Sequence, residues 1–206
     1  MFPVTGAAIA TLGSFLGSET ISASDALAAR LDEVQFDLGE GPCWDAMSFA
    51  RPVLEPDIRS EPRRAWPAFS PAIADMEVAS LFAFPLTVGT LRIGAIDLYC
   101  SKPVVLDEQQ THEASAMADA VSRQVLRRAL DDLGGDYDAV GNAFSRRLIH
   151  QATGMVLAQL RITADDARLV IQGHAFATGR PMMEVAQDII NRELTFTQGT
   201  EGIETA

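Results

Sequence analysis

Side chains that could carry out covalent chemistry are few and widely spaced in this 206-residue chain. The reactive groups are three histidines and two cysteines: His112, His150, His174, Cys43 and Cys100. Their spacing matches neither a nucleophile–base arrangement nor a metal site, and two cysteines cannot form a disulfide scaffold. A G-x-G triplet at residues 39–41 is only a weak sign of a phosphate loop. We therefore expect no enzymatic activity, no metal and no cofactor.

Arginine is the more informative residue type. Of the 16 basic residues only Lys102 is lysine, and arginine suits bidentate contacts to phosphates and bases. The composition of a GC-rich genome explains this preference at least equally well. The net charge of −12 argues against nonspecific nucleic-acid binding. Residues 1–144 hold 10 basic and 21 acidic residues, whereas residues 145–196 hold 6 and 5, so the charge pattern separates an acidic part from a nearly neutral one.

Three helical segments between residues 145 and 196 would position the later arginines. Apolar residues recur at helical spacing over 147–161, and Thr163 has the side chain of a helix N-cap. Gly179 suits a helix end and Pro181 a helix start, so a third helix is expected from there. The pattern predicts a three-helix bundle, which at this size would gain stability from a dimer partner or a neighbouring domain.

This segment also resembles the ANTAR domain, a small three-helix RNA-binding module of bacterial antitermination regulators. The resemblance rests on Gln151–Gly154, on the run from His174 to Pro181 and on Glu184–Ala186. The chain departs from the family where it has Thr153 instead of lysine and Gln172 instead of arginine. Both departures remove positive charge from the implied RNA face.

The resemblance implies an RNA-binding face whose residues are Arg146, Arg147, His150, Gln151, Thr153, Gly154, His174 and Arg180. We interpret the arginines as phosphate contacts, although solvated charges fit the sequence equally well. His174 could contact an unpaired base or occupy a core position facing the first helix. Gly154 costs about 1 kcal/mol in a helix relative to alanine, which indicates a close approach by another helix or by RNA.

Residues 3–130 alternate between strand and helix patterns. Strands are expected at 7–12, 19–24, 80–88 and 91–100, an extended segment at 53–56, and helices at 24–31, 43–50 and 107–133, with an irregular to helical stretch at 66–76. Gly89-Thr90 between two apolar runs indicates a hairpin. The segment Leu38–Cys43, with the hairpin residues Phe84–Tyr99 behind it, resembles a GAF domain, a sensory α/β fold.

GAF domains bind varied small molecules over the sheet, and the fold does not name the ligand. The aromatic residues Trp44, Trp66, Phe69, Phe82 and Phe84 are our predicted ligand-pocket lining, although each of them also fits a core position. The family's cyclic-nucleotide signature is absent, and the few histidines and cysteines do not favour a haem, a bilin or an iron–sulfur cluster. Cys43 could sense redox state at a helix start, but we favour a buried structural role.

The predicted fold class is α+β, with a GAF-like antiparallel sheet and flanking helices followed by an all-α three-helix ANTAR bundle. The predicted domains are residues 1–133, without the helix that usually precedes the first GAF strand, a linker at 134–144, the RNA-binding domain at 145–196 and a flexible tail at 197–206. The apolar N-terminal stretch has no basic residue before it, and no run of 18 apolar residues occurs. We expect a cytoplasmic protein that does not enter membranes.

The function implied by both resemblances is signal-responsive RNA regulation. The expected partners are RNA stem-loops, an unknown small-molecule signal and a second copy of the chain in a homodimer. The effect on RNA would be transcription antitermination or control of translation. The alternative is a ligand-binding or protein-interaction dimerisation module that no longer binds RNA, which the acidic balance and the missing basic residues favour.

Overall fold

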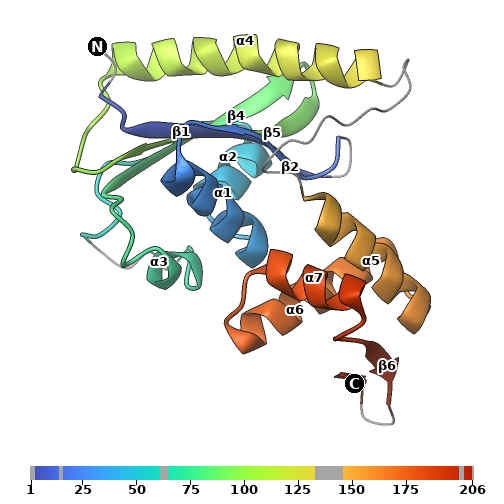
Figure 1. Cartoon of the computed structure of the whole chain (residues 1–206). Coiled ribbons are helices and arrows are strands. Elements are labelled where there is room, and N and C mark those ends of the chain that lie inside the picture. The colour runs from blue at the N-terminus through green and yellow to red at the C-terminus, as the bar shows by residue number, and fades with distance from the viewer. Residues whose placement is uncertain (1–2, 14–15, 61–64, 133–145, 200–201, 206) are drawn as a thin grey trace. The chain divides into compact units, whose positions relative to one another are not determined.

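A computed structural model of the chain describes residues 3–13, 16–60, 65–132, 146–199 and 202–205. It divides into two compact units, Met1–Phe144 and Ser145–Ala206 (Figure 1). The predicted linker at 134–144 lies outside the described residues.

The N-terminal unit is built on a five-stranded antiparallel sheet. Its strands are β1 (Gly6–Thr11), β2 (Glu19–Ala23), β3 (Val53–Glu55), β4 (Ser80–Val88) and β5 (Leu91–Cys100), and their order in the sheet is β2-β1-β5-β4-β3. The predicted β4–β5 hairpin is confirmed, with Val88 paired to Leu91 around the turn at Gly89, whose φ is 60°. Long apolar strands thus form the centre of the sheet, and shorter strands form its edges.

Helices cover both faces of this sheet (Figure 1). On one face, α4 (Glu108–Asp132) packs over Phe82, Phe84 and Ile96. On the other face, the shorter helices are α1 (Ala26–Leu38), α2 (Pro42–Phe49) and α3 (Phe69–Ala72). Side chains alternate between the two faces along a strand, so neighbouring residues of β4 contribute to separate cores.

Helix α1 differs from its prediction at both ends. Its N-cap is Asp25, whose carboxylate accepts a hydrogen bond from the Ala28 N–H at 2.8 Å, whereas Ser24 Oγ accepts one from the Ala7 N–H. The helix continues past the expected end at Leu31 to Leu38 and stops at Gly39, which has a φ of 66°. The longer helix places two polar residues, Asp32 and Gln35, in the interior, where they find polar partners.

A polar network is buried between α1 and the sheet. The Gln35 side chain donates a hydrogen bond to Asp97 of β5 and accepts one from the Cys43 N–H at 2.9 Å. Asp32 is hydrogen-bonded to Thr20 of β2. Burial raises the pKa of Asp97 to about 8, the charge of Asp32 adds to this effect, and the hydrogen bond from Gln35 opposes it. We name Thr20, Asp32, Gln35 and Asp97 the buried polar network.

The C-terminal unit contains the three expected helices. They are α5 (Arg147–Leu160), α6 (Ala164–Thr178) and α7 (Met182–Asn191). Thr163 caps α6, since its hydroxyl accepts a hydrogen bond from the Asp166 N–H, and Gly179 ends it with a φ of 65°. The core consists of buried alanines, β-branched residues and one methionine: Ile149, Ala152, Val156, Ala167, Ile171, Met182, Val185, Ala186 and Ile189. Small residues let these three short helices pack closely.

The chain after α7 differs from the expected flexible tail. Strands β6 (Phe196–Gln198) and β7 (Ile203–Thr205) pair in an antiparallel hairpin. Phe196 is 3% exposed, and its N–H donates to Gln159 Oε1 of α5 at 3.0 Å. Burial of this one aromatic side chain attaches the hairpin to the bundle, which the polar composition of the segment did not indicate.

Candidate nucleic-acid interface and ligand pocket

One side of α5 carries half of the residues predicted to contact RNA. Arg147, His150, Gln151 and Gly154 recur at helical spacing, and all four are exposed. The opposite side of the same helix is buried in the bundle core, so the helix presents this stripe outward. Helix α5 contains no acidic residue, so its own sequence adds no negative charge beside the stripe. We name these four residues the α5 stripe.

Gly154 lies at the C-terminal end of the α5 stripe. A Cβ added there would meet nothing within 4 Å in the described residues. Close packing of another helix of the unit therefore does not explain the glycine, although glycine costs about 1 kcal/mol in a helix interior. The described residues thus do not supply the close approach by another helix that the sequence analysis considered for Gly154.

Two other predicted residues on α5 are placed less favourably for contacting RNA. Thr153 is half-buried, and its hydroxyl donates to the Ile149 carbonyl of its own helix at 2.7 Å. Arg146, at the N-cap position of α5, is only 3% exposed. A phosphate contact by Arg146 would require this side chain to be uncovered, so its burial does not fit the role that we predicted for it.

His174 contacts the C-terminal hairpin. Its ring packs edge-on against Phe196, with 5.6 Å between ring centroids and 87° between planes. The histidine is half-buried, so one part of the ring stays accessible. This position is intermediate between the two interpretations of the sequence, because the ring both packs in the fold and reaches the surface.

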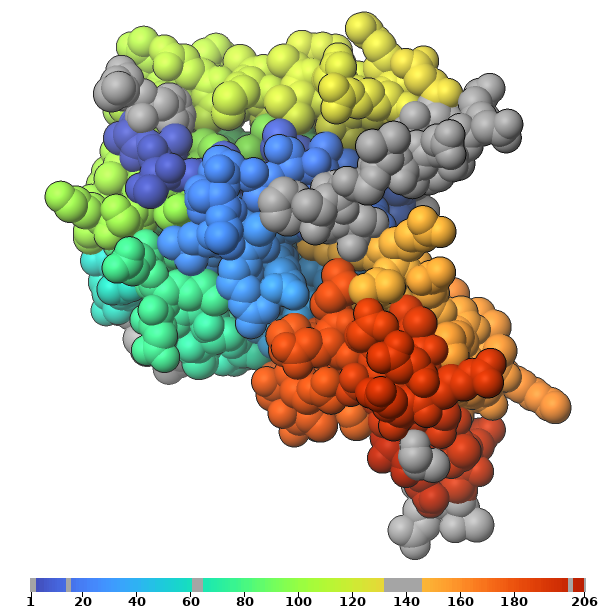
Figure 2. Space-filling model, in the orientation of Figure 1, coloured from blue at the N-terminus to red at the C-terminus, as the bar shows by residue number. Residues whose placement is uncertain are grey.

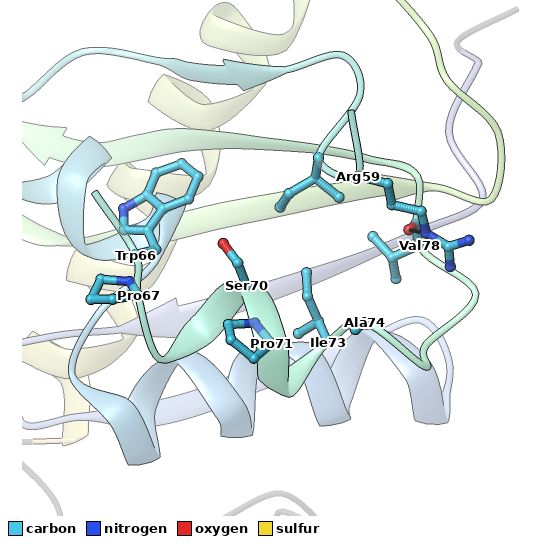
Figure 3. Close-up of a pocket in the computed structure, with 9 residues that line it drawn as sticks. Arg59, Trp66, Pro67, Ser70, Pro71, Ile73, Ala74 and Val78 are labelled. Carbon is cyan, nitrogen blue, oxygen red and sulfur yellow. Dashed lines mark hydrogen bonds between the residues drawn. The ribbon is translucent and has the colours of Figure 1, made fainter. Parts of the chain in front are cut away.

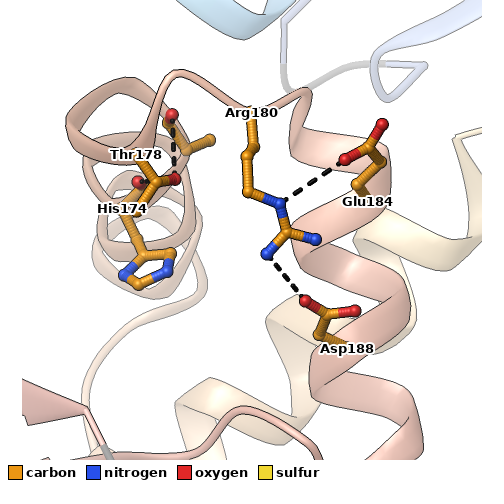
Figure 4. Close-up of polar contacts among 6 residues, drawn as sticks. His174, Thr178, Arg180, Glu184 and Asp188 are labelled. Atoms are coloured by element: carbon orange, nitrogen blue, oxygen red, sulfur yellow. Dashed lines mark hydrogen bonds and ion pairs between the residues drawn. The ribbon is translucent and has the colours of Figure 1, made fainter.

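Arg180 forms ion pairs within the fold (Figure 4). Its guanidinium lies 2.8 Å from Asp188 and 3.4 Å from Glu184, both on α7. The hydrogen bond to Asp188 is the main cause of the raised pKa of Arg180, and Glu184 adds to it. These carboxylates offset the charge that we predicted for phosphate contact, so Arg180 primarily fixes the corner between α6 and α7.

Sequence reasoning missed two exposed residues of this unit. Phe176 of α6 is 66% exposed, and Arg161 directly after α5 is also exposed. The sequence could have indicated that Phe176 is exposed. At helical spacing it falls outside the buried stripe formed by Ala167, Ile171 and Ala175. An aromatic side chain at such a position is available for stacking on a base.

A pocket of about 410 Å³ opens beside α3 in the N-terminal unit. Its lining is mainly apolar and consists of Ile58, Arg59, Trp66, Pro67, Ser70, Pro71, Ile73, Ala74 and Val78. Figure 3 shows Trp66 and Pro67 at one end, Arg59 and Val78 at the other, and Ser70 between them. The volume is within the usual range for small-molecule sites.

Only Trp66 of the five predicted aromatic residues lines this pocket. Phe82 and Phe84 point to the opposite face of the sheet and pack under α4. Phe69 is fully buried beneath α3, with its ring edge-on to Trp66 at 6.3 Å. Trp44 is half-buried, and its indole N–H donates to the Gln35 carbonyl at 2.7 Å. These four residues do not line this pocket, because aromatic residues chosen by type belong to several cores.

The polar groups of the pocket are Arg59 and Ser70. Arg59 donates to the carbonyls of Val78 and Met76, and it makes no ion pair with any described residue. No carboxylate of the described residues therefore offsets its positive charge. Ser70 Oγ is a buried oxygen without a hydrogen-bond partner in the described part of the chain. Both groups are suited to meeting polar atoms of a bound molecule.

Two contacts hold the pocket wall against the segment around α2. The Glu40 carboxylate accepts hydrogen bonds from the N–H groups of Ala68 and Phe69, both at 2.6 Å. The Trp66 indole N–H donates to Asp45 at 3.1 Å. Glu40, within the Leu38–Cys43 segment on which the resemblance rests, therefore also caps α3.

Cys43 is 1% exposed and packs with Leu12 and Ala95, which fits the structural role that we favoured. Within the described residues, no three His, Cys, Asp or Glu side chains are grouped closely enough to hold a metal ion. Nor does any helix in those residues combine the length and apolar character needed to cross a bilayer.

Family comparison identifies the N-terminal unit. Residues 4–125 match the GAF domain family, so the chain belongs to that family. The predicted α+β fold class is also confirmed. Residues 143–190 match the ANTAR domain, and the chain thus has the GAF–ANTAR architecture. No curated protein sequence gives a significant match.

Solved structures show a distant similarity. The GAF domain region of a protein from Geobacter sulfurreducens PCA is 14% identical, with a TM-score of 0.47, over 60% of this chain and 82% of that one. A type II free methionine-R-sulfoxide reductase from Thermoplasma acidophilum is 17% identical, with a TM-score of 0.40, over 59% and 78%. Similarity at this level does not bear on activity.

Proposed function

We propose that the protein is a non-enzymatic, cytoplasmic regulator that binds paired RNA stem-loops through its ANTAR domain under control of its GAF domain. The observation that carries this proposal is the α5 stripe, exposed and without acidic neighbours on its own helix, in a domain of an RNA-binding family. Binding would prevent terminator formation or change translation initiation. A homodimer would present two equal surfaces to a tandem pair of hairpins.

RNA binding would use phosphate contacts from the α5 stripe and contacts to unpaired bases near it. Arg147 begins the stripe, and exposed Phe176 offers a ring on which a base can stack. Gly154 would allow the RNA backbone to approach the helix closely. Since Arg180 is paired with Asp188 and Glu184, we assign it a structural role in this mode of binding.

Gel shifts with two-hairpin RNAs test this assignment. Arg147→Ala should weaken binding to every hairpin and lower the slope of log K against log salt by about one unit. Arg180→Ala serves as the matched control, because it removes the same charge outside the α5 stripe. Equal affinities and equal slopes for the wild type and Arg147→Ala would contradict a phosphate contact by Arg147.

The GAF domain would supply the signal through the pocket beside α3. The pocket combines an indole wall, an arginine without a carboxylate partner and an unpartnered hydroxyl among the described residues. These groups match a small molecule with an apolar body and an anionic or hydrogen-bonding end. Titration of aromatic and branched aliphatic carboxylates into a Trp44→Phe variant, followed by Trp66 fluorescence and by gel shift, tests this. Ser70→Ala and Arg59→Gln should weaken any ligand that binds there.

A second candidate function is a ligand-binding dimerisation module that does not bind RNA. The burial of Arg146 and the pairing of Arg180 favour it, because both reduce the positive charge available to phosphates. Selection of bound transcripts from cells separates the two functions. Recovery of hairpin-containing RNAs by the wild type but not by Arg147→Ala supports the regulator, and recovery of no RNA supports the module.

A further inference from the structure

One short stretch of chain joins the buried polar network to the wall of the pocket. Residues 35–45 run from the last turn of α1 through the turn at 39–42 into α2, and we name them the connecting segment. At its start Gln35 belongs to the buried polar network, and at its end Asp45 accepts a hydrogen bond from the Trp66 indole N–H at 3.1 Å. Figure 2 shows the outer surfaces of α1, in blue, and of the α3 region, in blue-green, on the same face, and the two helices are in contact.

Gln35 fixes the beginning of the connecting segment to both the sheet and α2. Its side chain donates to Asp97 of β5 and accepts from the Cys43 N–H at 2.9 Å, at the start of α2. Its carbonyl accepts from the Trp44 indole N–H at 2.7 Å. Because the side chain and the backbone of one residue bind both elements, a displacement of Gln35 also displaces the start of α2.

The turn between α1 and α2 rests on the same side chain. Gly41 has a φ of 131°, and a Cβ added there would lie 2.7 Å from Gln35 Oε1 and 2.8 Å from its Cγ. The turn therefore contacts Gln35 directly through its backbone. Glu40, the neighbour of Gly41, accepts from the N–H groups of Ala68 and Phe69 at the start of α3. A displacement of Gln35 thus reaches the pocket wall through the adjacent residue.

A carboxyl pair lies at the interior end of the connecting segment. Asp32 and Asp97 are both buried, and Asp97 Oδ1 has no hydrogen-bond partner among the described residues. Burial raises the pKa of Asp97 to about 8, and the charge of Asp32 adds to this effect. Loss of the proton places a second negative charge beside Asp32, in an interior that strengthens their repulsion.

The charge of Asp32 is not offset by the residues paired with Asp97 in the sheet. Those residues are alanines, Ala8 of β1 and Ala83 of β4. Helix α4 packs on the opposite face of the sheet and contributes Ala114, Ala118 and Val125 there. The titratable groups on the surrounding elements are Asp32 on α1, Cys43 and Asp45 on α2, Tyr99 on β5 and, hydrogen-bonded to Tyr99, Asp25 at the N-cap of α1.

We propose that the connecting segment couples the protonation of the Asp32–Asp97 pair to closure of the pocket wall. The protonated pair keeps α2 and α3 in place, and loss of its proton releases the wall. Rising pH therefore favours the open wall. By linkage, a molecule that binds only the closed wall favours proton uptake by the pair. The consequence for signalling, a ligand response that weakens at alkaline pH, rests on the proposed function of the pocket.

Amide hydrogen exchange of the full chain, without ligand or RNA, tests the coupling separately from that function. The N–H groups of Ala68 and Phe69, which Glu40 binds, report closure of the wall. After correction for intrinsic exchange, their protection should fall about tenfold between about pH 7 and about pH 9, across the pKa of about 8. At both pH values they should exchange faster than Phe84 and Ile96 in the sheet, since the wall opens locally without unfolding of the unit.

Two variants separate the carboxyl pair from other effects of pH. Asp97→Asn still accepts from Gln35 but has no proton to lose, so the protection of the wall should become independent of pH. Glu55→Gln is the matched control, because it removes a buried carboxyl on β3 outside the buried polar network, and it should keep the wild-type dependence. Circular dichroism of both variants checks that the fold is retained.

The two indole N–H resonances give a second readout, one near each end of the connecting segment. Trp44 reports the contact with Gln35, and Trp66 reports the contact with Asp45. Both resonances should shift with one common midpoint in the wild type, and neither should shift in Asp97→Asn. Wall amides that exchange no faster than the sheet, pH dependence that persists in Asp97→Asn, or a shift of Trp44 without Trp66 would each overturn the proposal.

Discussion

The two units of this protein place their charged groups differently. The N-terminal unit buries three carboxylates, those of Asp32, Glu55 and Asp97. In the described part of the C-terminal unit, Arg146 is the single buried charged residue, and the other charges lie at or near the surface. Desolvation of these three carboxylates therefore opposes folding of the GAF unit. The ANTAR unit does not carry this cost, and apolar packing and helix caps stabilise it.

This difference fits the division of labour that we propose. A core with ionisable groups changes its stability when their protonation or hydrogen bonding changes, so a bound molecule can shift its balance of states. The described core of the ANTAR unit buries no carboxylate, so we expect it not to respond to such changes. Both tryptophans, Trp44 and Trp66, lie in the GAF unit, so tryptophan fluorescence follows the unfolding of that unit alone.

The largest effect is expected from Gln35→Leu, which tests whether the GAF core depends on its buried polar groups. Gln35 is fully buried and bonds both Asp97 and the Cys43 N–H. Its loss leaves a buried carboxyl and a buried N–H without partners, so unfolding free energy should fall by about 2–4 kcal/mol. Denaturant unfolding followed by tryptophan fluorescence measures this. A loss below about 1 kcal/mol would show that the buried polar network does not support the core.

The second test concerns pH. Asp97 holds its proton up to a pKa of about 8 in the folded protein, against a usual value of 3.8, so the folded state binds more protons between these values. Stability contributed by this group is present below pH 3.8 and is lost as pH rises towards 8.

Asp97→Asn removes this titration, because the amide stays neutral and can still accept from Gln35. The variant should be more stable than the wild type at about pH 8, by about 1–3 kcal/mol, with little gain at about pH 4. Fluorescence-detected unfolding at both values measures it. An equal change in stability at the two pH values would contradict the raised pKa of Asp97. The unfolding of the ANTAR unit, followed by its helical circular dichroism signal, should not depend on pH in this way.

The third test asks whether the open glycine of α5 serves an external partner. Gly154→Ala should stabilise the ANTAR unit by about 0.5–1 kcal/mol, because alanine fits the helix without a clash. It should at the same time weaken RNA binding. Gly173→Ala on α6, another open helical glycine, is the matched control that should stabilise without affecting RNA. Unchanged RNA affinity in Gly154→Ala would contradict the proposal that RNA approaches α5 closely at this glycine.

The smallest effect is expected from Arg180→Ala. The side chain is partly exposed, and its ion pairs with Glu184 and Asp188 join α7 to the end of α6. Thermal unfolding followed by circular dichroism should show a slight decrease in the midpoint, with hairpin affinity close to that of the wild type. A loss of hairpin affinity as large as that caused by Arg147→Ala would show that Arg180 contacts RNA, as the sequence analysis predicted.

Periodic and turn signals predicted most elements of the fold. The β4–β5 hairpin and α5 were predictable because long apolar runs and a glycine turn leave few alternatives. Helix α1 was predicted too short because Asp32 and Gln35 interrupt its apolar pattern, although both are buried. Their partner Asp97 is 62 residues from Gln35 in sequence, and no local pattern reveals such a contact.

The candidate sites were predicted less completely than the fold. The family resemblance supplied the residues of the α5 stripe, and helical spacing alone suffices to place them on one side of one element. The pocket depends on which side of a strand each aromatic residue faces, and Phe82 and Phe84 face α4. The ion pairs of Arg180 depend on the angle between two helices, which the sequence does not specify.

The capping of α3 by Glu40 also has a kinetic consequence. This four-residue helix forms one wall of the pocket, and a single carboxylate satisfies two N–H groups at its start. Release of that carboxylate would loosen the wall without disturbing the sheet. We therefore expect ligand entry and exit rates to follow the lifetime of the Glu40 contacts, so that how quickly the protein responds and how tightly it binds are set by different residues.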